Sequence, residues 1–247
     1  MKVRHYYVFG DRLQDKFQGD ILNEGNWDAL RLDEVEGPFS LEKSVEAYEK
    51  NCENSVEYKN VAEKICHLLA SEDINVQKII SLGVGKGVLE WHLKKMMPKC
   101  IVECTDYTAK SIEQLKKVFR DVDAAYSFDI LKGDYTRLDK NAIFIMYRVS
   151  TEFSLQEWYD IFEKMHDAGV FYIIFIPAGL DKVSDMIREK VGHIKNIIRG
   201  KKDTQCGWLY SESEFLKMFR GRGGKVLYDV VNKVRLENTA IYFLKRN

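Results

Sequence analysis

The 247-residue chain has three prolines and no serine- or glycine-rich tract. Such features are typical of long disordered segments, so their scarcity predicts a chain that is folded over most of its length. The longest apolar stretch, residues 170–180, is far too short to span a membrane. Residues 1–12 contain no apolar run of the signal-peptide kind. We therefore expect a cytoplasmic protein without a membrane anchor.

Cysteine is also scarce, and the net charge is zero. The five cysteines are an odd, scattered set, which argues against a disulfide framework. Cys100 and Cys104 share one apolar run without a second pair nearby, which favours core packing over a metal site. The 38 basic and 38 acidic side chains cancel, which argues against a bulk nucleic-acid binder.

The charges are unevenly distributed. Residues 20–53 contain ten Asp/Glu and three Lys/Arg, which gives a net charge of −7. Two helices are predicted here, one capped by Ser40 and running to about Cys52, the other covering about residues 55–70. We expect residues 1–75 to form an N-terminal helical extension that covers a larger core.

From residue 78 onward, short apolar runs alternate with amphipathic helical patterns. The predicted strands are residues 78–82, 100–104, 142–147 and 170–176, with a weaker candidate at 128–131. This alternation predicts a parallel sheet covered on both faces. The last two runs, 225–231 and 239–245, are separated by a short turn and are therefore predicted to be antiparallel neighbours.

A glycine triplet, Gly83, Gly85 and Gly87, follows the first of these strands and opens a helix. Glycine lets the chain turn tightly and lets a ligand approach the backbone. Asp106 follows the next strand, 19 residues after the last glycine (106 − 87), where an acid can hold both hydroxyls of a ribose. Asp134 follows the third strand and could accept a hydrogen bond from an adenine amino group. The structural alternatives are a helix cap for Asp106 and a turn residue for Asp134.

Residues 76–247 resemble class I S-adenosylmethionine (SAM)-dependent methyltransferases. The resemblance depends on the glycine loop, Asp106, the pair Gly133–Asp134 and the terminal hairpin. The resemblance implies an α/β, Rossmann-like, seven-stranded and mostly parallel sheet with helices on both faces and an antiparallel last strand. It also implies SAM across the strand tips. Its methionine part would lie at the glycine loop, its ribose at Asp106, and its adenine near Asp134 and Tyr135. Tyr107 is a further candidate cofactor-binding residue.

One residue departs from the family pattern. An acid often stands two residues before the first loop glycine, and here Ser81 takes that place in the cofactor site. Glu90, on the first turn of the following helix, is a candidate to supply the missing charge. NAD is the rival cofactor, but its G-x-G-x-x-G spacing fits the triplet less well.

The acceptor side of the site is predicted after the fourth strand. Tyr147 and Glu152 are candidate bases there, and Arg148 is a candidate substrate-binding residue. Residues 182–202 follow the fifth strand as an insertion or lid, with seven Lys/Arg against two Asp/Glu, a net charge of +5. This segment carries His193, the most plausible histidine base, although an ordinary amphipathic helix is the simpler interpretation.

The sequence thus predicts a SAM-dependent methyltransferase acting on an oxygen of a small molecule, a saccharide or a nucleotide sugar, with no resident metal. A nucleic-acid methyltransferase and a non-catalytic SAM-binding scaffold remain alternatives. Neither the acceptor nor the oligomeric state follows from the sequence.

Overall fold

The computed structural model describes residues 2–7, 41–179, 183–200, 204–237 and 239–247. Seven strands form one sheet in the order β4-β3-β2-β5-β6-β9-β8. The first five in sequence are parallel: β2 (Lys78–Leu82), β3 (Ile101–Asp106), β4 (Ala124–Ser127), β5 (Ile143–Tyr147) and β6 (Tyr172–Ile176). Strand β9 (Ala240–Arg246) is inserted antiparallel between β6 and β8 (Tyr228–Arg235). The predicted α/β sheet with an antiparallel last strand is confirmed.

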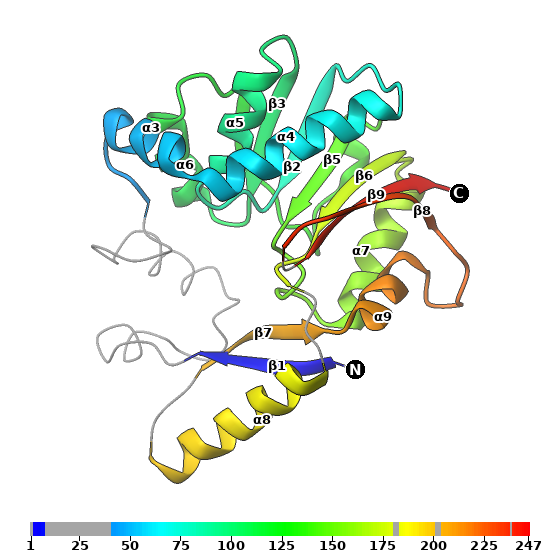
Figure 1. The fold of residues 1–247 in the computed structure, drawn as a ribbon. Coiled ribbons are helices and arrows are strands. Elements are labelled where there is room, and N and C mark those ends of the chain that lie inside the picture. The colour runs from blue at the N-terminus through cyan, green and yellow to red at the C-terminus, as the bar shows by residue number, and fades with distance from the viewer. Residues whose placement is uncertain (1, 8–40, 180–182, 201–203, 238) are drawn as a thin grey trace.

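Helices cover both faces of this sheet (Figure 1). Side chains alternate along a strand, so each strand contributes to two cores. One core, which includes Ile79, lies under α3 (Val45–Asn54), α4 (Val56–Ser71), α5 (Val88–Met96) and α6 (Ala109–Val118). The other, which includes Ile80, lies under α7 (Leu155–Asp167) and α9 (Glu212–Phe215).

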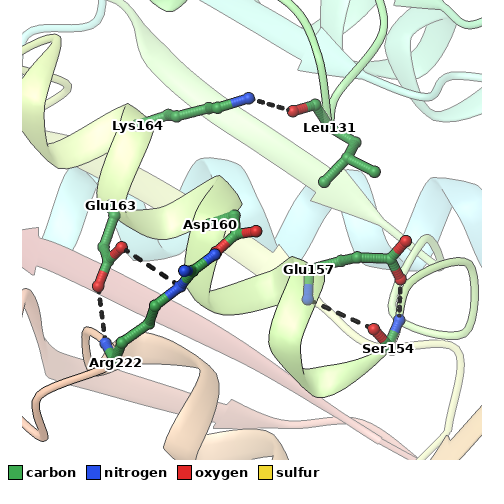
Figure 2. Close-up of polar contacts among 7 residues, drawn as sticks. All are labelled: Leu131, Ser154, Glu157, Asp160, Glu163, Lys164 and Arg222. Atoms are coloured by element: carbon green, nitrogen blue, oxygen red, sulfur yellow. Dashed lines mark hydrogen bonds and ion pairs between the residues drawn. The ribbon is translucent and has the colours of Figure 1, made fainter.

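Helix α7 is fixed at its start and along its outer face (Figure 2). The Ser154 hydroxyl accepts a hydrogen bond from the Glu157 N–H at 3.4 Å, and the Glu157 carboxylate accepts one from the Ser154 N–H at 2.7 Å. This is the predicted capping box. Further along, the Arg222 N–H donates to Glu163 and its Nε to Asp160, both at 2.7 Å. These bonds tie the turn before β8 to the helix.

A second, smaller unit lies at one end of the molecule (Figure 1). Strand β1 (Lys2–Tyr7) pairs antiparallel with β7 (Thr204–Tyr210), and α8 (Val183–Ile198) packs against β1. Helix α8 occupies most of the predicted insertion, whose residues 182 and 201–202 lie outside the described ranges. Neither β1 nor β7 is predicted from the sequence, because two short strands about 200 residues apart carry no local pairing signal.

Several local predictions need correction. Helix α3 is capped by Ser44, whose hydroxyl accepts from the Ala47 N–H at 3.2 Å, whereas the expected cap, Ser40, lies outside the described residues. The third strand covers Ala124–Ser127 rather than residues 128–131. Among the described helices, none is long and apolar enough to cross a membrane.

Candidate functional site

The glycine loop lies at the carboxyl end of β2, where the strand order reverses. Strands β3 and β4 extend to one side of β2 and β5 and β6 to the other, so a crevice is expected beyond these strand ends. Gly83, Gly85 and Gly87 all have positive φ, at +72°, +59° and +70°. A Cβ on Gly83 would lie 2.7 Å from Val149 Cγ1, and one on Gly87 would lie 2.9 Å from Leu115 Cδ1. Glycine is therefore needed both for the turn and for the space.

Asp106 at the end of β3 lies directly against this loop. Its Oδ2 accepts a hydrogen bond from the Gly85 N–H at 2.9 Å, and its Oδ1 accepts one from the Thr108 N–H at 3.4 Å. The residue is only 2% exposed. The N–H groups of Gly83 and Val84 donate to the Thr105 carbonyl at 2.9 and 3.0 Å, which fixes the loop to β3. The structure thus brings the glycines and the predicted ribose-binding acid together.

A second buried carboxylate lies beside the loop. The Ser81 hydroxyl donates to Glu90 Oε1 at 2.5 Å, and Glu90 is 2% exposed. Burial, together with the negative charge of Asp106, raises the pKa of Glu90 to about 7, while the Ser81 hydrogen bond acts in the opposite direction. Ser81 stands at the position where an acid was expected from the resemblance. Its hydroxyl instead binds the acid Glu90, which lies on the first turn of α5.

The carboxyl end of β5 carries a polar and aromatic cluster that includes two residues from α4. The Tyr147 hydroxyl donates to Glu57 Oε1 at 3.3 Å, and Arg148 Nη1 lies 3.7 Å from the same oxygen. The Tyr58 ring meets the Tyr147 ring edge-on, with 5.5 Å between centroids. Burial raises the pKa of the Tyr147 phenol, so it stays protonated at neutral pH and acts as a donor. Tyr147 is thus poorly suited to be a base.

Arg148 has an unusual backbone. Its φ is +62°, a conformation that costs an arginine free energy, and its N–H donates to the Ile176 carbonyl at 2.8 Å. Nearby, the Ser150 hydroxyl accepts from the Ala178 N–H at 3.0 Å. The ends of β5 and β6 are therefore held together where the acceptor residues were predicted.

Strand β7 fixes the loop that follows Arg148. The Trp208 N–H donates to the Thr151 carbonyl at 2.8 Å. A Cβ on Gly207, whose φ is +145°, would lie 2.2 Å from that same carbonyl oxygen. Burial raises the pKa of Cys206 on β7, and the charge of Glu152, which belongs to this loop, raises that pKa further. The small unit thus contacts the predicted acceptor loop directly.

The other predicted site residues have structural contacts. Asp134 caps a short 3₁₀ turn: its Oδ1 accepts from the Thr136 N–H at 3.0 Å and hydroxyl at 2.6 Å. Tyr135 is 3% exposed and donates to the Ile130 carbonyl at 2.8 Å. The His193 ring stacks on Tyr6 at 3.7 Å within the small unit. Tyr107 directly follows Asp106 and is 36% exposed.

Sequence reasoning missed Glu57, Tyr58 and Gly207. Glu57 and Tyr58 were part of a predicted helix, but nothing in the sequence shows that the start of this helix reaches the end of β5. Gly207 sits in a strand that was not predicted. An isolated glycine within an apolar stretch was the available signal, since it often marks a close approach of two backbones.

Solved structures that resemble this chain identify its fold. No protein-family model matches the sequence, and no curated protein does. Magnesium protoporphyrin IX methyltransferase from Synechocystis PCC 6803, solved with SAH, has a TM-score of 0.55 at 13% identity; the match covers 78% of this chain and 84% of that one. Human N-acetylserotonin methyltransferase in complex with SAM has a TM-score of 0.50 at 14% identity, covering 69% of this chain and 48% of that one. The chain has the class I methyltransferase fold.

The name of a third similar structure proposes a different kind of enzyme. A Rhodobacter sphaeroides protein whose name proposes a zinc-dependent alcohol dehydrogenase has a TM-score of 0.54 at 10% identity, covering 70% of this chain and 85% of that one. The methyltransferase fold alone therefore does not choose between methyl and hydride transfer, and the side chains around the loop must decide. Within the described part of the chain, no three His, Cys, Asp or Glu residues are grouped so that they could hold a metal ion.

Proposed function

We propose that this protein binds SAM at the glycine loop and transfers its methyl group to an oxygen of a small-molecule acceptor. The observation that carries this proposal is the pair of buried carboxylates beside the loop: Asp106, which accepts from the Gly85 N–H, and Glu90, which accepts from the Ser81 hydroxyl. SAM combines a ribose with cationic sulfonium and ammonium groups, so it can use both carboxylates. Asp106 would bind the ribose hydroxyls, and Glu90 with Ser81 would face the cationic end.

The start of α5 argues against a dinucleotide. A dinucleotide places its pyrophosphate at the start of the helix after such a loop, where free N–H groups receive it. Here the Gly85 N–H already donates to Asp106, and Glu90 lies on the first turn of α5. A pyrophosphate at this place would favour the protonated form of Glu90, and an ionised Glu90 would repel it. The charge at the loop therefore favours a cationic cofactor.

The acceptor would bind at the end of β5. SAM supplies an electrophilic methyl group, so the main task of the protein is to align the acceptor oxygen with it. Tyr147, Tyr58 and Arg148 would supply a ring surface and donors to an oxygen-rich acceptor such as a phenol or a saccharide. The carboxylates of Glu57 and Glu152 are better placed than His193 to take the hydroxyl proton.

Calorimetric titration with SAM, S-adenosylhomocysteine and NAD tests the cofactor. We expect binding of both adenosyl compounds and no binding of NAD. Asp106→Ala should weaken SAM binding by roughly 1.5–3 kcal/mol, because it removes hydrogen bonds to a charged group. Asp229→Ala is the matched control, since Asp229 is exposed on β8 at the edge of the sheet away from β3, and it should bind SAM as the wild type does.

Equal SAM affinity in Asp106→Ala and the wild type would contradict the ribose assignment. Tight binding of NAD without SAM would contradict the proposed function as a whole. SAM binding without methyl transfer to any phenol or saccharide would favour the non-catalytic alternative.

A further inference from the structure

A lysine stands in the middle of the glycine loop. Lys86 lies between Gly85 and Gly87, both of which have positive φ. Its Nζ lies 3.4 Å from Glu42 Oε1, and the two side chains are 25% and 16% exposed. Ion pairs withdrawn from solvent in this way are screened less than those at the surface. The charge of Lys86 is therefore balanced by a carboxylate from outside the loop.

Glu42 is held beside the loop by contacts of its own backbone and of the helix that follows it. Its carbonyl accepts a hydrogen bond from Gln114 Nε2 on α6 at 2.8 Å. Helix α3 begins three residues later (45 − 42), and the hydroxyl of its fully buried Tyr48 donates to the Gly87 carbonyl at 3.0 Å. The Glu42 carboxylate is thus a fixed counter-charge, whereas the lysine side chain is long and flexible.

The Glu42 carboxylate depends strongly on this pairing. Its second oxygen, Oε2, is buried and has no hydrogen-bond partner among the residues that the structure describes. A buried carboxylate oxygen without a donor is costly. The Lys86 ammonium is the described group that compensates the charge, so the two side chains hold each other on the α3 side of the loop.

The charge of Lys86 bears directly on the proposed cofactor. SAM contains a sulfonium cation, and S-adenosylhomocysteine lacks this cation but has the same adenosine, ammonium and carboxylate groups. An unbalanced ammonium in the glycine loop would repel the sulfonium, most strongly where water is excluded. The same ammonium would have much less effect on the neutral thioether of S-adenosylhomocysteine.

Given the proposed SAM site, on which this inference rests, we propose that Glu42 is a specificity-determining residue for the cofactor. It neutralises Lys86 and holds the ammonium away from the crevice, so that the loop accepts a sulfonium. Glu42 acts through Lys86 and is therefore a positioning residue. Its removal should change the preference for SAM over S-adenosylhomocysteine, which loss of loop structure alone would not do.

Calorimetric titration of the full-length chain with both adenosyl compounds tests the proposal. Glu42→Gln should weaken SAM binding by about fivefold, because the Lys86 charge is no longer balanced, and should leave S-adenosylhomocysteine binding almost unchanged. The loss should shrink at high salt, where charges are screened. Combining Glu42→Gln with Lys86→Gln should restore SAM binding to nearly the wild-type level. Lys86→Gln alone should tighten SAM binding relative to S-adenosylhomocysteine binding.

The matched control is an ion pair of similar burial elsewhere in the sheet. Glu103 Oε1 lies 2.8 Å from Lys78 Nζ, and these side chains are 16% and 23% exposed. Lys78 begins β2, at the opposite end of the strand from the glycine loop. Glu103→Gln should therefore leave the affinities for both compounds unchanged.

Three results would overturn the proposal. Equal weakening of SAM and S-adenosylhomocysteine by Glu42→Gln would mean that Glu42 shapes the loop or binds a group that both compounds share. Unchanged SAM affinity in Glu42→Gln, or a double variant as weak as the single one, would show that Lys86 does not act on the sulfonium. These failures leave the proposed function intact, because the wild type would still bind SAM. A wild type that binds neither compound would contradict the proposed function itself.

Discussion

The seven-stranded sheet and the small β1–β7–α8 unit are held together in different ways. The sheet has apolar cores on both faces, with fully buried Trp158, Phe162 and Phe175 in mutual ring contact. In the small unit the Tyr6 and His193 rings stack, His5 contacts Glu189, and Val3 and Met186 are buried. Its helix α8 leaves several large apolar side chains exposed, namely Ile187, Val191, Ile194, Ile197 and Ile198. Local stability follows buried contacts, so the unit should open much more readily than the sheet.

This difference also separates two parts of the candidate site. The glycine loop and Asp106 belong to the sheet, whereas the loop after β5 is fixed partly by β7 through Thr151. Cofactor binding should therefore depend on the stable region, and acceptor binding on both regions. Substitutions can test this division.

The largest effect is expected for Trp158→Ala. Trp158 is fully buried and its Nε1 donates to the Ser150 carbonyl at 3.2 Å. We expect the free energy of unfolding to fall by about 3–5 kcal/mol, because a cavity replaces the ring. Urea denaturation measures this. Leu216→Ala, at a residue that is 37% exposed, should change stability far less, and equal losses in the two variants would contradict the comparison.

A smaller and more local effect is expected for Gly207→Ala. The new methyl group would collide with the Thr151 carbonyl, which should cost roughly 1–3 kcal/mol and separate β7 from the acceptor loop. Amide hydrogen exchange should accelerate in 2–7, 204–210 and 149–154 while β2, β3 and β5 stay protected. SAM affinity should not change. Faster exchange in β2 would instead place the small unit within the cooperative core.

An effect of similar size, confined to the cofactor side of the site, is expected from pH. Glu90 has a pKa raised to about 7, so the folded state binds a proton that the unfolded state releases near 4.5. Stability from this group is complete below pH 4.5 and is lost as the pH rises toward 7, by on the order of 1–3 kcal/mol. Glu90→Gln should flatten this dependence in denaturation curves measured from pH 4.5 to 8. An unchanged slope would show that another group titrates.

Elements with a strong local pattern were predictable from the sequence. The predicted strands at 78–82 and 170–176 correspond closely to β2 and β6, because each is a short apolar run that is buried on both faces of the sheet. The Ser154–Glu157 capping box was predictable because both of its residues lie within one turn of the chain. By contrast, β1 and β7 depend on a pairing between distant segments, which no local pattern encodes.

The predictions for the site residues also differ in how well local sequence supports them. The spacing between Asp106 and the glycines predicted that they lie close together. They do, because Asp106 ends β3 and the glycines follow the neighbouring parallel strand β2. The Asp134 carboxylate caps a turn, because Thr136 offers two nearby donors, and its role near an adenine stays a prediction. The His193 ring stacks on Tyr6, and its role as a base likewise stays a prediction. Spacing identifies the end of a strand, but the direction of a side chain depends on its neighbours.

The pairing of β1 with β7 has a consequence for synthesis. Lys2 pairs with Tyr210, so β1 emerges from the ribosome 208 residues before its partner (210 − 2). At about 5–20 residues per second, β1 waits on the order of ten to forty seconds with its backbone groups unpaired. Most of the sheet is complete by then. The small unit is therefore assembled late, onto a domain that has already begun to fold, and a chaperone would encounter β1 as a free strand.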